Sequence, residues 1–256
     1  MILKVLGSVS PHCHNEKNCP GYLVTTNDAK ILLDCGNGIT RNLNYPEDIE
    51  DLIIIISHYH KDHYGDLLSL AYDSYVYNKL GLLKNKIKVY IPKPTSIQEE
   101  IDYQFITNLG EEQYFDIHLY SLTDKITIGN TKISFSNNPH SIPSYSIKIQ
   151  EQDKSLVYSG DTGYIGNTIE KFAAGSNLLI CESTFLKGQQ RNKDYHLYAN
   201  EAAQIAKKSQ VKQLLLTHFW PDIDKQLYLE EATPIFKKTL LARENLLLKI
   251  KYKSML

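Results

Sequence analysis

The feature that most constrains the fold of this chain is a group of four metal-ligand side chains within six positions. The group comprises His58, His60, Asp62 and His63, directly after the aliphatic segment 52–56. These side chains cannot all converge from one regular helix or strand, because neighbouring side chains there point in different directions. They can converge from a loop at the carboxyl end of a strand, where α/β proteins place their sites. The group therefore predicts an α/β fold with a metal site at a sheet edge.

An incidental cluster of polar residues in a surface loop is the alternative explanation for this group. The chain has nine histidines in 256 residues, so three of them within six positions are not expected by chance. Imidazole and carboxylate are ligands that zinc, iron and manganese accept. We therefore interpret the group as part of a metal site.

The spacing of apolar residues predicts strands and helices in both halves of the chain. The sequence has no internal repeat, low-complexity tract or Pro/Ser-rich linker. We therefore expect one domain, residues 1–256, in which two sheets pack face to face with helices outside. The predicted strands are residues 2–6, 22–25, 30–34, 52–56, 87–91, 126–128, 132–135, 145–149, 156–158, 178–181, 213–217 and 246–251. The predicted helices are residues 66–80, 95–106, 199–208 and 227–241.

Composition argues against several classes of protein. The 28 basic and 29 acidic residues give a net charge of −1, without the basic surplus of a dedicated nucleic-acid binder. Four cysteines do not make a disulfide scaffold in a chain of this length and indicate reduced cytoplasmic thiols or metal ligands. The aliphatic run 52–56 is far shorter than the ~20 residues of a membrane helix, and the N-terminus lacks a secretory signal. We expect a cytoplasmic protein without a membrane partner.

Two metal ions need more ligands than the group at 58–63 provides. Three further candidates follow predicted strands or lie at their ends: His140, Asp161 and His218. Each of these, taken alone, is more often a capping, turn or core residue than a ligand. Their shared position after strands favours the interpretation that they gather at one edge of the sheets.

The order and spacing of these seven residues resemble the ligand set of the metallo-β-lactamase superfamily, and the similarity extends through almost the whole chain. The resemblance implies an αβ/βα sandwich of four layers with a dinuclear site, most simply of zinc, with manganese or iron as alternatives. One ion would be bound by His58, His60 and His140. The other would be bound by Asp62, His63 and His218, with Asp161 bridging the two.

The segments 32–41, 178–185 and 195–203 are similar to the ribonuclease Z branch of this superfamily. The resemblance implies that His196 is a catalytic proton donor and that Glu182 orients it. An imidazole with an ordinary pKa of ~6.5 can supply the proton that an alkoxide needs to leave phosphorus. The alternatives are that His196 caps the following helix or lies on the surface, and that Glu182 only ends its strand.

Two departures from that branch concern the substrate. The tRNA-processing members carry a long arm, in many cases between the equivalents of His140 and Asp161, and only 21 positions separate these residues here. The residues after His196 are Leu197 and Tyr198, where the tRNA enzymes carry small hydroxyl residues. The chain therefore resembles an armless relative that acts on a small phosphodiester or on RNA. Relatives in this branch are often dimers, which makes a homodimer the expectation.

The expected mechanism is phosphodiester hydrolysis by a metal-bridging hydroxide. Asp62 would bind metal and orient the hydroxide, and His196 would protonate the leaving oxygen. A tRNA 3′ endonuclease and a thioester, lactone or β-lactam hydrolase are the alternative enzymes. The pair of His196 and Glu182 argues against acyl chemistry, which does not need that donor. A non-catalytic metal-binding module is the alternative from another class.

A second run of soft or borderline ligands lies near the N-terminus. It comprises His12, Cys13, His14 and Cys19. Some phosphodiesterase relatives bind a structural zinc near this end through closely spaced cysteines, but the Cys-x-Cys spacing is missing here. The alternative is a loop that covers the active site, with Cys19 packed inside as a small apolar residue.

Overall fold

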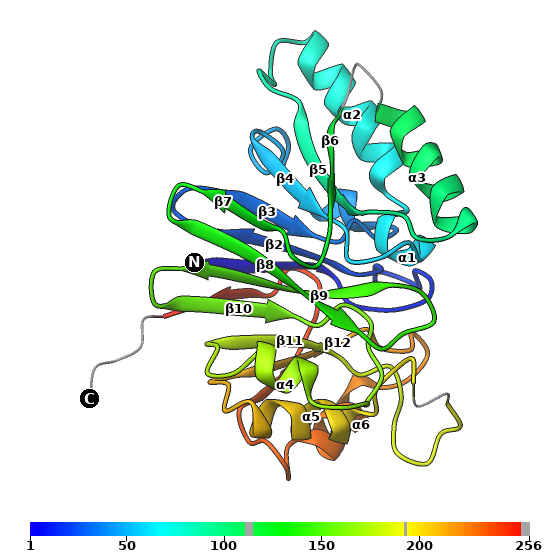
Figure 1. Cartoon of the computed structure of the whole chain (residues 1–256), viewed down its shortest axis with the longest axis vertical. Helices are drawn as coiled ribbons and strands as arrows, with labels where there is room; N and C mark the ends of the chain where they lie inside the picture. Colours follow the sequence, from blue (N-terminus) through cyan, green and yellow to red (C-terminus); the bar gives the residue numbers. More distant parts are fainter. Residues whose placement is uncertain (111–114, 192–193, 252–256) are drawn as a thin grey trace.

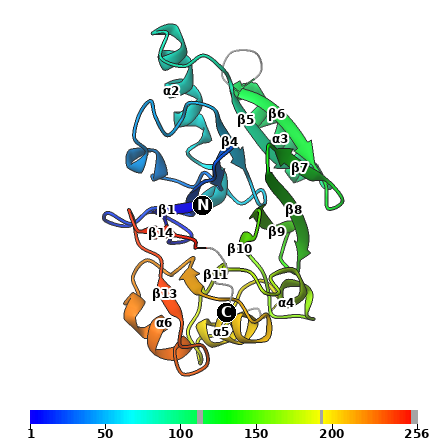
Figure 2. The same cartoon turned by 90° about the vertical axis from the view of Figure 1, so that its left-hand side faces the viewer.

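Two seven-stranded mixed sheets pack face to face, and helices cover the outer face of each (Figure 1, Figure 2). The structure is a computed structural model that describes residues 1–110, 115–191 and 194–251. The first sheet has the order β14-β1-β2-β3-β4-β5-β6, and the second has the order β13-β12-β11-β10-β9-β8-β7. These four layers confirm the predicted αβ/βα sandwich.

The first sheet is built mainly from the N-terminal part of the chain. Its strands are β1 (Ile2–Gly7), β2 (Gly21–Thr25), β3 (Lys30–Leu33), β4 (Leu52–Ile55), β5 (Ile87–Pro92), β6 (Phe115–Tyr120) and the C-terminal β14 (Leu247–Lys249). Its helical segments are η1 (Ile39–Asn42), α1 (Lys61–Tyr64), α2 (Leu67–Lys79) and α3 (Ile97–Gly110).

The second sheet follows in the chain. Its strands are β7 (Lys125–Ile128), β8 (Thr131–Asn138), β9 (Ser144–Glu151), β10 (Lys154–Tyr158), β11 (Leu178–Glu182), β12 (Leu214–Thr217) and β13 (Thr239–Leu241). The helices associated with it are α4 (Thr168–Phe172), α5 (Ala199–Lys208) and α6 (Lys225–Ala232). They lie together below the sheets in Figure 1, opposite α2 and α3.

Strand β4 shows why the central strands are continuously apolar. Its residues Ile53 and Ile55 pack into the core between the sheets, whereas Leu52 and Ile54 pack into the core beneath α2 and α3. Alternate side chains of a strand point to opposite faces, so a strand covered on both faces needs apolar residues at every position. The segment carrying the histidine group is therefore anchored on both sides.

The parallel pairings place the chain segments that follow several strands at one edge of each sheet. Strands β3, β4 and β5 run parallel in the first sheet, and β10, β11 and β12 run parallel in the second. Strand β8 has the same direction, because it pairs antiparallel with β9, which pairs antiparallel with β10. This arrangement brings together the segments that carry the candidate ligands.

Four local predictions were incomplete or wrong. The predicted helix 227–241 is instead α6 followed by β13, because Pro234 lacks the N–H that a continuing helix needs and residues 239–241 pair with β12. Strand β6 and helix α4 were not predicted. The loop at 58–63 contains the short helix α1, which carries Asp62 and His63. Among the described residues, no helix combines the length and apolarity needed to span a membrane.

Candidate metal centre

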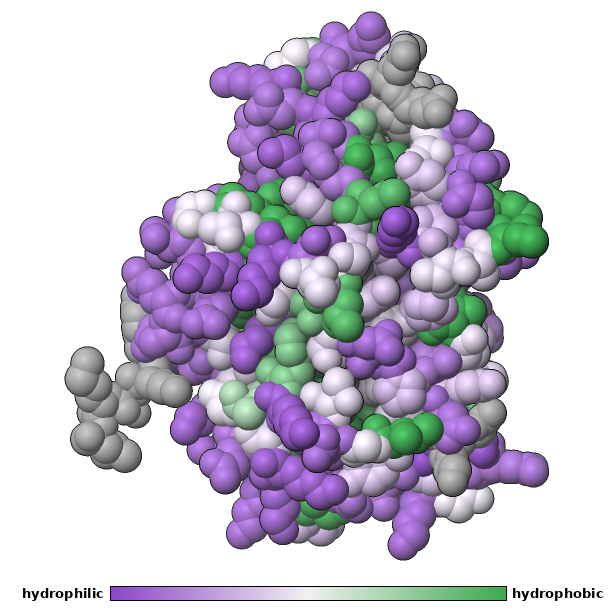
Figure 3. All heavy atoms as spheres, viewed as in Figure 1, coloured by the Kyte–Doolittle hydropathy of each residue, from purple (hydrophilic) through white to green (hydrophobic). Residues whose placement is uncertain are grey.

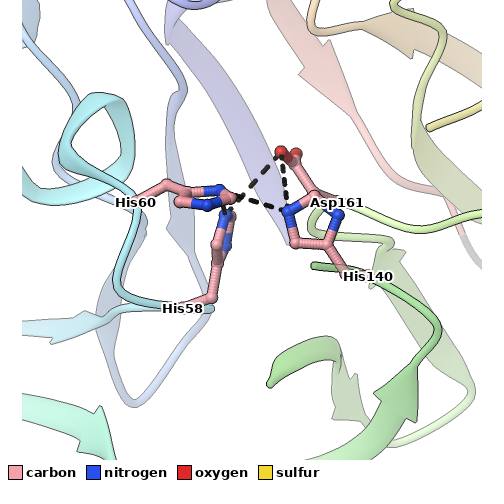
Figure 4. Close-up of side chains that lie close together, drawn as sticks. All are labelled: His58, His60, His140 and Asp161. Carbon is pink, nitrogen blue, oxygen red and sulfur yellow. Dashed lines mark hydrogen bonds and ion pairs between the residues drawn. The ribbon is translucent and has the colours of Figure 1, made fainter. Parts of the chain in front are cut away.

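The first cluster of candidate ligands joins two strand ends of the second sheet to one of the first. His58 and His60 follow β4, and His140 and Asp161 follow β8 and β10. The Nδ1 atom of His60 lies 3.0 Å from Nε2 of His58 and 3.1 Å from Nε2 of His140. Asp161 Oδ2 lies 3.7 Å from the first of these Nε2 atoms and 3.8 Å from the second. Figure 4 shows these four side chains pointing toward one another.

The second cluster lies on the other side of Asp161. Its members Asp62 and His63 come from α1, and His218 follows β12. The Nε2 atoms of His63 and His218 are 3.3 Å apart and lie 3.6 and 3.7 Å from Asp62 Oδ2. The same two nitrogens lie 3.4 and 3.1 Å from Asp161 Oδ1. The structure thus brings all seven predicted ligand residues together.

Asp161 is placed between the two clusters. Its Oδ2 atom faces the first cluster and its Oδ1 atom faces the second. Oδ1 is buried and accepts no hydrogen bond from the described residues, which is costly for a carboxylate oxygen that has no other partner. A cation between each oxygen and its neighbouring imidazoles would satisfy both oxygens, so this donor set fits metal ions.

The hydrogen bonds behind the rings of His218 and His63 orient these side chains as ligands. The Thr184 hydroxyl donates its proton to the Glu182 carboxylate at 2.8 Å, so it must accept from Nδ1 of His218, also at 2.8 Å. Nδ1 of His63 donates to Asp34 Oδ2 at 2.7 Å. With Nδ1 of both rings engaged in these bonds, Nε2 is the atom that faces Asp161 and that would bind a metal ion.

The rings of His58 and His140 are oriented in the same way. The Ser57 hydroxyl donates to Asp34 Oδ2 at 2.8 Å and therefore accepts from Nδ1 of His58 at 2.9 Å. Nδ1 of His140 donates to the backbone carbonyl of Tyr195 at 2.7 Å. Four Nε2 lone pairs from different segments thus converge on the two clusters.

Burial and charge set the protonation states of the cluster. Burial lowers the pKa of His58 and lowers the pKa of His60 to about 4, so both rings are neutral at pH 7. Burial raises the pKa of Asp161, but the charges of His218 and His63 outweigh it and hold that pKa well below its ordinary value. Asp161 and Asp62 in turn raise the pKa of His63 well above its ordinary value against burial, so a metal ion would displace a proton from this ring. The pKa of Asp62 is lowered by the same two histidines against burial. Neutral imidazoles and ionised carboxylates are the forms that bind metal.

His196 and Glu182 form a hydrogen-bonded pair beside the first cluster. Nδ1 of His196 donates to Glu182 Oε1 at 3.0 Å and lies 3.9 Å from Asp161 Oδ2. The buried Glu182 carboxylate also accepts from the backbone N–H groups of Thr162 and Leu197, at 2.9 and 3.1 Å. Burial lowers the pKa of His196, but the charge of Glu182 and its hydrogen bond raise that pKa by more, to about 9. The imidazole therefore carries a proton at pH 7.

Sequence reasoning did not identify Asp34, Ser57 and Thr184, which orient the ligand rings. Asp34 and Ser57 follow the neighbouring parallel strands β3 and β4, so their position after strands was the available signal. Asp34 and the ligand His218 also adopt positive φ angles, of 57° and 62°. Such a backbone conformation is strained for residues other than glycine and is typical of functional sites.

The N-terminal run does not form a comparable ligand group. It comprises His12, Cys13, His14 and Cys19. The thiol of Cys13 donates to the backbone carbonyl of Asn37 at 2.8 Å, and His14 lies 3.5 Å from the Asp222 carboxylate. Among the described residues, every group of three or more converging ligand atoms belongs to the site around Asp161. Cys35 and Cys181 are buried thiols, as expected.

Comparison with known families agrees with this geometry. The family described as "Beta-lactamase superfamily domain" matches residues 29–219, a span that ends just after His218 and includes both clusters. The chain belongs to this superfamily. As a member of a family of metal-dependent hydrolases, it uses divalent metal ions, for which the His and Asp cluster provides candidate ligands.

Individual relatives from the superfamily match most of the chain. The probable metallo-hydrolase YhfI of Bacillus subtilis is 28% identical over 199 residues, which cover 77% of this chain and 78% of the relative. Its crystal structure superposes with a TM-score of 0.87 at 25% identity, covering 96% and 98% of the two chains. Ribonuclease Z of Thermococcus onnurineus is 26% identical over 270 positions, covering 83% of this chain and 82% of the relative.

A third similar protein supports the fold alone. The crystal structure of human tRNase Z, short form, superposes with a TM-score of 0.73 at 20% identity, covering 98% of this chain and 100% of the other. The fold and the ribonuclease Z-like resemblance are thus confirmed, whereas these similarities do not select a substrate.

Proposed function

We propose that this protein is a dinuclear zinc-dependent phosphodiesterase with His196 as the general acid. His58, His60 and His140 would hold one ion, and Asp62, His63 and His218 the other. The observation that carries the proposal is the position of Asp161, whose two carboxylate oxygens face different clusters while His196 lies beside them.

The two ions, when bound, supply an activated water and neutralise charge on the phosphoryl group. Asp62 serves as a ligand and as the acceptor that orients the water. Its carboxylate is held in place by the hydroxyl of Ser10, which donates to Oδ2 at 2.8 Å. Removing that hydroxyl would take away one of the contacts that position Asp62 beside His63 and His218.

His196 provides the proton for the leaving oxygen. Its Nδ1 proton is committed to Glu182, so the proton transferred is the one on Nε2. The Glu182 carboxylate keeps the imidazole protonated before transfer and stabilises its orientation. Acyl transfer does not require this donor, so the pair favours a phosphodiester over a thioester or lactone substrate.

The proposed substrate is a small diester or short RNA. The 20 residues between His140 and Asp161 contain β9 and β10 with their turns. The alignment with the archaeal ribonuclease Z has 270 positions, more than the 256 residues of this chain, so that relative carries insertions. The short span between His140 and Asp161 supports an enzyme without a tRNA-gripping arm. A tRNA 3′ endonuclease is the second candidate, favoured by the match to ribonuclease Z itself.

The first test is hydrolysis of bis(p-nitrophenyl) phosphate by zinc- or manganese-loaded protein, with metal content measured on the same samples. The His196→Ala variant should lose ~10²- to 10⁴-fold in kcat while retaining its metal ions. A diester with an alkyl leaving group should show the larger loss, because that group depends more on protonation. The matched control is His118→Ala, whose exposed ring pairs with Asp116 on β6.

No diester turnover by protein that holds two ions would contradict the proposal. Thioester or lactone hydrolysis would then assign the site to acyl chemistry. If the metal-loaded protein hydrolyses no ester of any kind, the site would instead be that of a non-catalytic metal-binding module. Efficient cleavage of a tRNA precursor at its 3′ end would favour the second candidate.

We also propose that the protein forms a homodimer through α2 and α3. Helix α3 exposes Ile97, Ile101 and Phe105, and the neighbouring α2 exposes Leu68 and Tyr72. Figure 3 shows apolar side chains at the right edge of the molecule, where α3 lies in Figure 1. An exposed apolar stripe of this kind is typical of an interaction surface. Light scattering should give a dimer mass for the native chain and a monomer mass for Ile101→Asp.

A further inference from the structure

A cavity of about 290 Å³, lined by none of the seven candidate ligands, includes Thr184 and Phe185, two neighbours of His196, in its walls. One wall comes from the segment after β11, which includes Thr184 and Phe185, and the other from the segment after β12, which includes Trp220. The Thr184 hydroxyl lies 3.3 Å from Nδ1 of His196, and the ring of Phe185 meets the His196 ring edge-on at 6.1 Å between centroids. The cavity thus shares two of its lining residues with the immediate surroundings of the proposed general acid.

The two walls are held at a fixed separation by one buried side chain. The hydroxyl of Tyr228 donates to the carbonyl of Thr184 at 3.1 Å and accepts from the backbone N–H of Trp220 at 3.3 Å. The backbone of Phe185 is tied to the segment around His196 by hydrogen bonds with Leu197 and Ala199. The two aromatic walls are thus in place before any ligand binds, which reduces the entropy cost of binding.

The chemistry of the lining combines flat aromatic surfaces with polar edges. Phe185 is partly buried and Trp220 is 40% exposed. The side chain of Gln189 accepts from the N–H of Leu186 at 2.6 Å, and its neighbour Gln190 also lines the cavity. The amide of Gln190 on one wall and the carboxylate of Asp222 on the other provide hydrogen-bond donors and acceptors.

We propose that this cavity binds the nucleobase of a nucleotide diester whose phosphate lies at the metal clusters. The inference rests on the proposed phosphodiesterase function and specifies its substrate class. Phe185 and Trp220 provide the stacking surfaces, while Gln190 and Asp222 face the polar edge of the base. The volume lies near the lower end of the range for ligand pockets and suits a single base.

The sequence provides a direct probe, because Trp220 is its only tryptophan. Zinc-loaded full-length protein would be titrated with adenosine 5′-monophosphate and, separately, with ribose 5-phosphate, which lacks the base. Excitation at the red edge of tryptophan absorption avoids absorption by adenine. We expect saturable quenching by the nucleotide, with ribose 5-phosphate binding more weakly by roughly 5- to 150-fold, the factor that corresponds to one stacked base.

Calorimetry on variants tests the two aromatic walls separately. Phe185→Ala and Trp220→Ala should each weaken nucleotide binding by roughly 5- to 150-fold. Neither substitution should change the binding of ribose 5-phosphate. Trp220→Phe should restore most of the nucleotide affinity, because it keeps a stacking face. The matched control is Leu247→Ala on β14, where the apolar side chain is 65% exposed and does not line this cavity.

The outcomes separate this inference from the proposed function. Equal affinity for the two ligands, or nucleotide binding that leaves tryptophan emission unchanged, would overturn the nucleobase site. If such a protein still hydrolyses diesters, the phosphodiesterase function stands without the subsite. Base-dependent quenching of tryptophan fluorescence in a protein that hydrolyses no diester would support the nucleobase site and contradict the proposed phosphodiesterase function.

Discussion

The loop after β4 and the loop between β1 and β2 both carry histidines close to other metal-ligand side chains. In the first loop, the ligand atoms of His58 and His60 are 3.0 Å apart and point at the Asp161 side chain from the other sheet. In the second loop, Nδ1 of His12 donates to the carbonyl of Cys13, and the side chain of that cysteine is exposed. The first loop converges on a centre, and the second does not.

The difference between the loops lies in what stands behind the histidine rings. Asp34 and Ser57 hold the outer nitrogens of the first loop, and both follow strands buried inside the sandwich. The histidines of the second loop have partly or fully exposed partners, as at the contact of His14 with Asp222. A dense group of ligand residues is therefore insufficient, because a metal site also needs rigid partners that fix ring orientation.

Removing the residue shared by both clusters should give the largest effect. We expect Asp161→Asn to bind fewer metal ions and to lose more activity than the ~10–100-fold that follows loss of an outer partner. The reason is that one carboxylate oxygen in each cluster comes from this side chain. Metal analysis and diester hydrolysis measure the two effects. The control is Asp116→Asn, which removes an exposed carboxylate that pairs with His118. Unchanged metal content in the Asp161→Asn variant would contradict the bridging role of Asp161.

Removing the support behind the rings should have the next largest effect. Asp34→Asn should weaken metal affinity ~10–100-fold, because this carboxylate orients His63 directly and His58 through Ser57. Competition with a chelator measures the affinity. Tyr158→Phe removes only a hydroxyl that donates to Asp34 at 2.7 Å and should cost less. Equal affinities in the native and Asp34→Asn proteins would remove the distinction drawn between the two loops.

The pair at His196 predicts a change in pH dependence. The general acid acts while protonated, so activity should fall as pH rises through its pKa, which Glu182 raises to about 9 against the effect of burial. Glu182→Gln removes the charge and should move the alkaline limb of kcat/KM to lower pH, with metal content unchanged. A limb that stays in place would show that this carboxylate does not control the proton on His196.

Changing the second loop should have the smallest effect. Cys13→Ser should change the free energy of unfolding by less than about 0.5 kcal/mol, because the side chain is exposed and serine can still donate to the carbonyl of Asn37. Zinc content should also be unchanged. Loss of one zinc ion per chain, measured by metal analysis, would instead establish a structural site there and overturn the comparison.

Local sequence was sufficient for most elements of the fold. Apolar runs with strand-like spacing identified β4 and β11, and the apolar spacing of residues 199–208 identified α5. Strand β6 was missed, although it pairs with β5 over residues 115–120. Strand β13 was wrongly included in the predicted helix 227–241, because three residues are too few to show the alternation of a strand. Only their pairing with β12 defines them as a strand.

For the site, the sequence alone determined the residue types, their positions after strands and the superfamily that they resemble. Only the tertiary structure decided which ring nitrogens face inward, that Asp161 points one oxygen at each cluster, and that Thr184 links Glu182 to His218. Ligand type and strand pattern are local properties of the chain. Ring orientation depends on hydrogen bonds between residues far apart in sequence, such as His63 and Asp34, and these form only when the sheets pack.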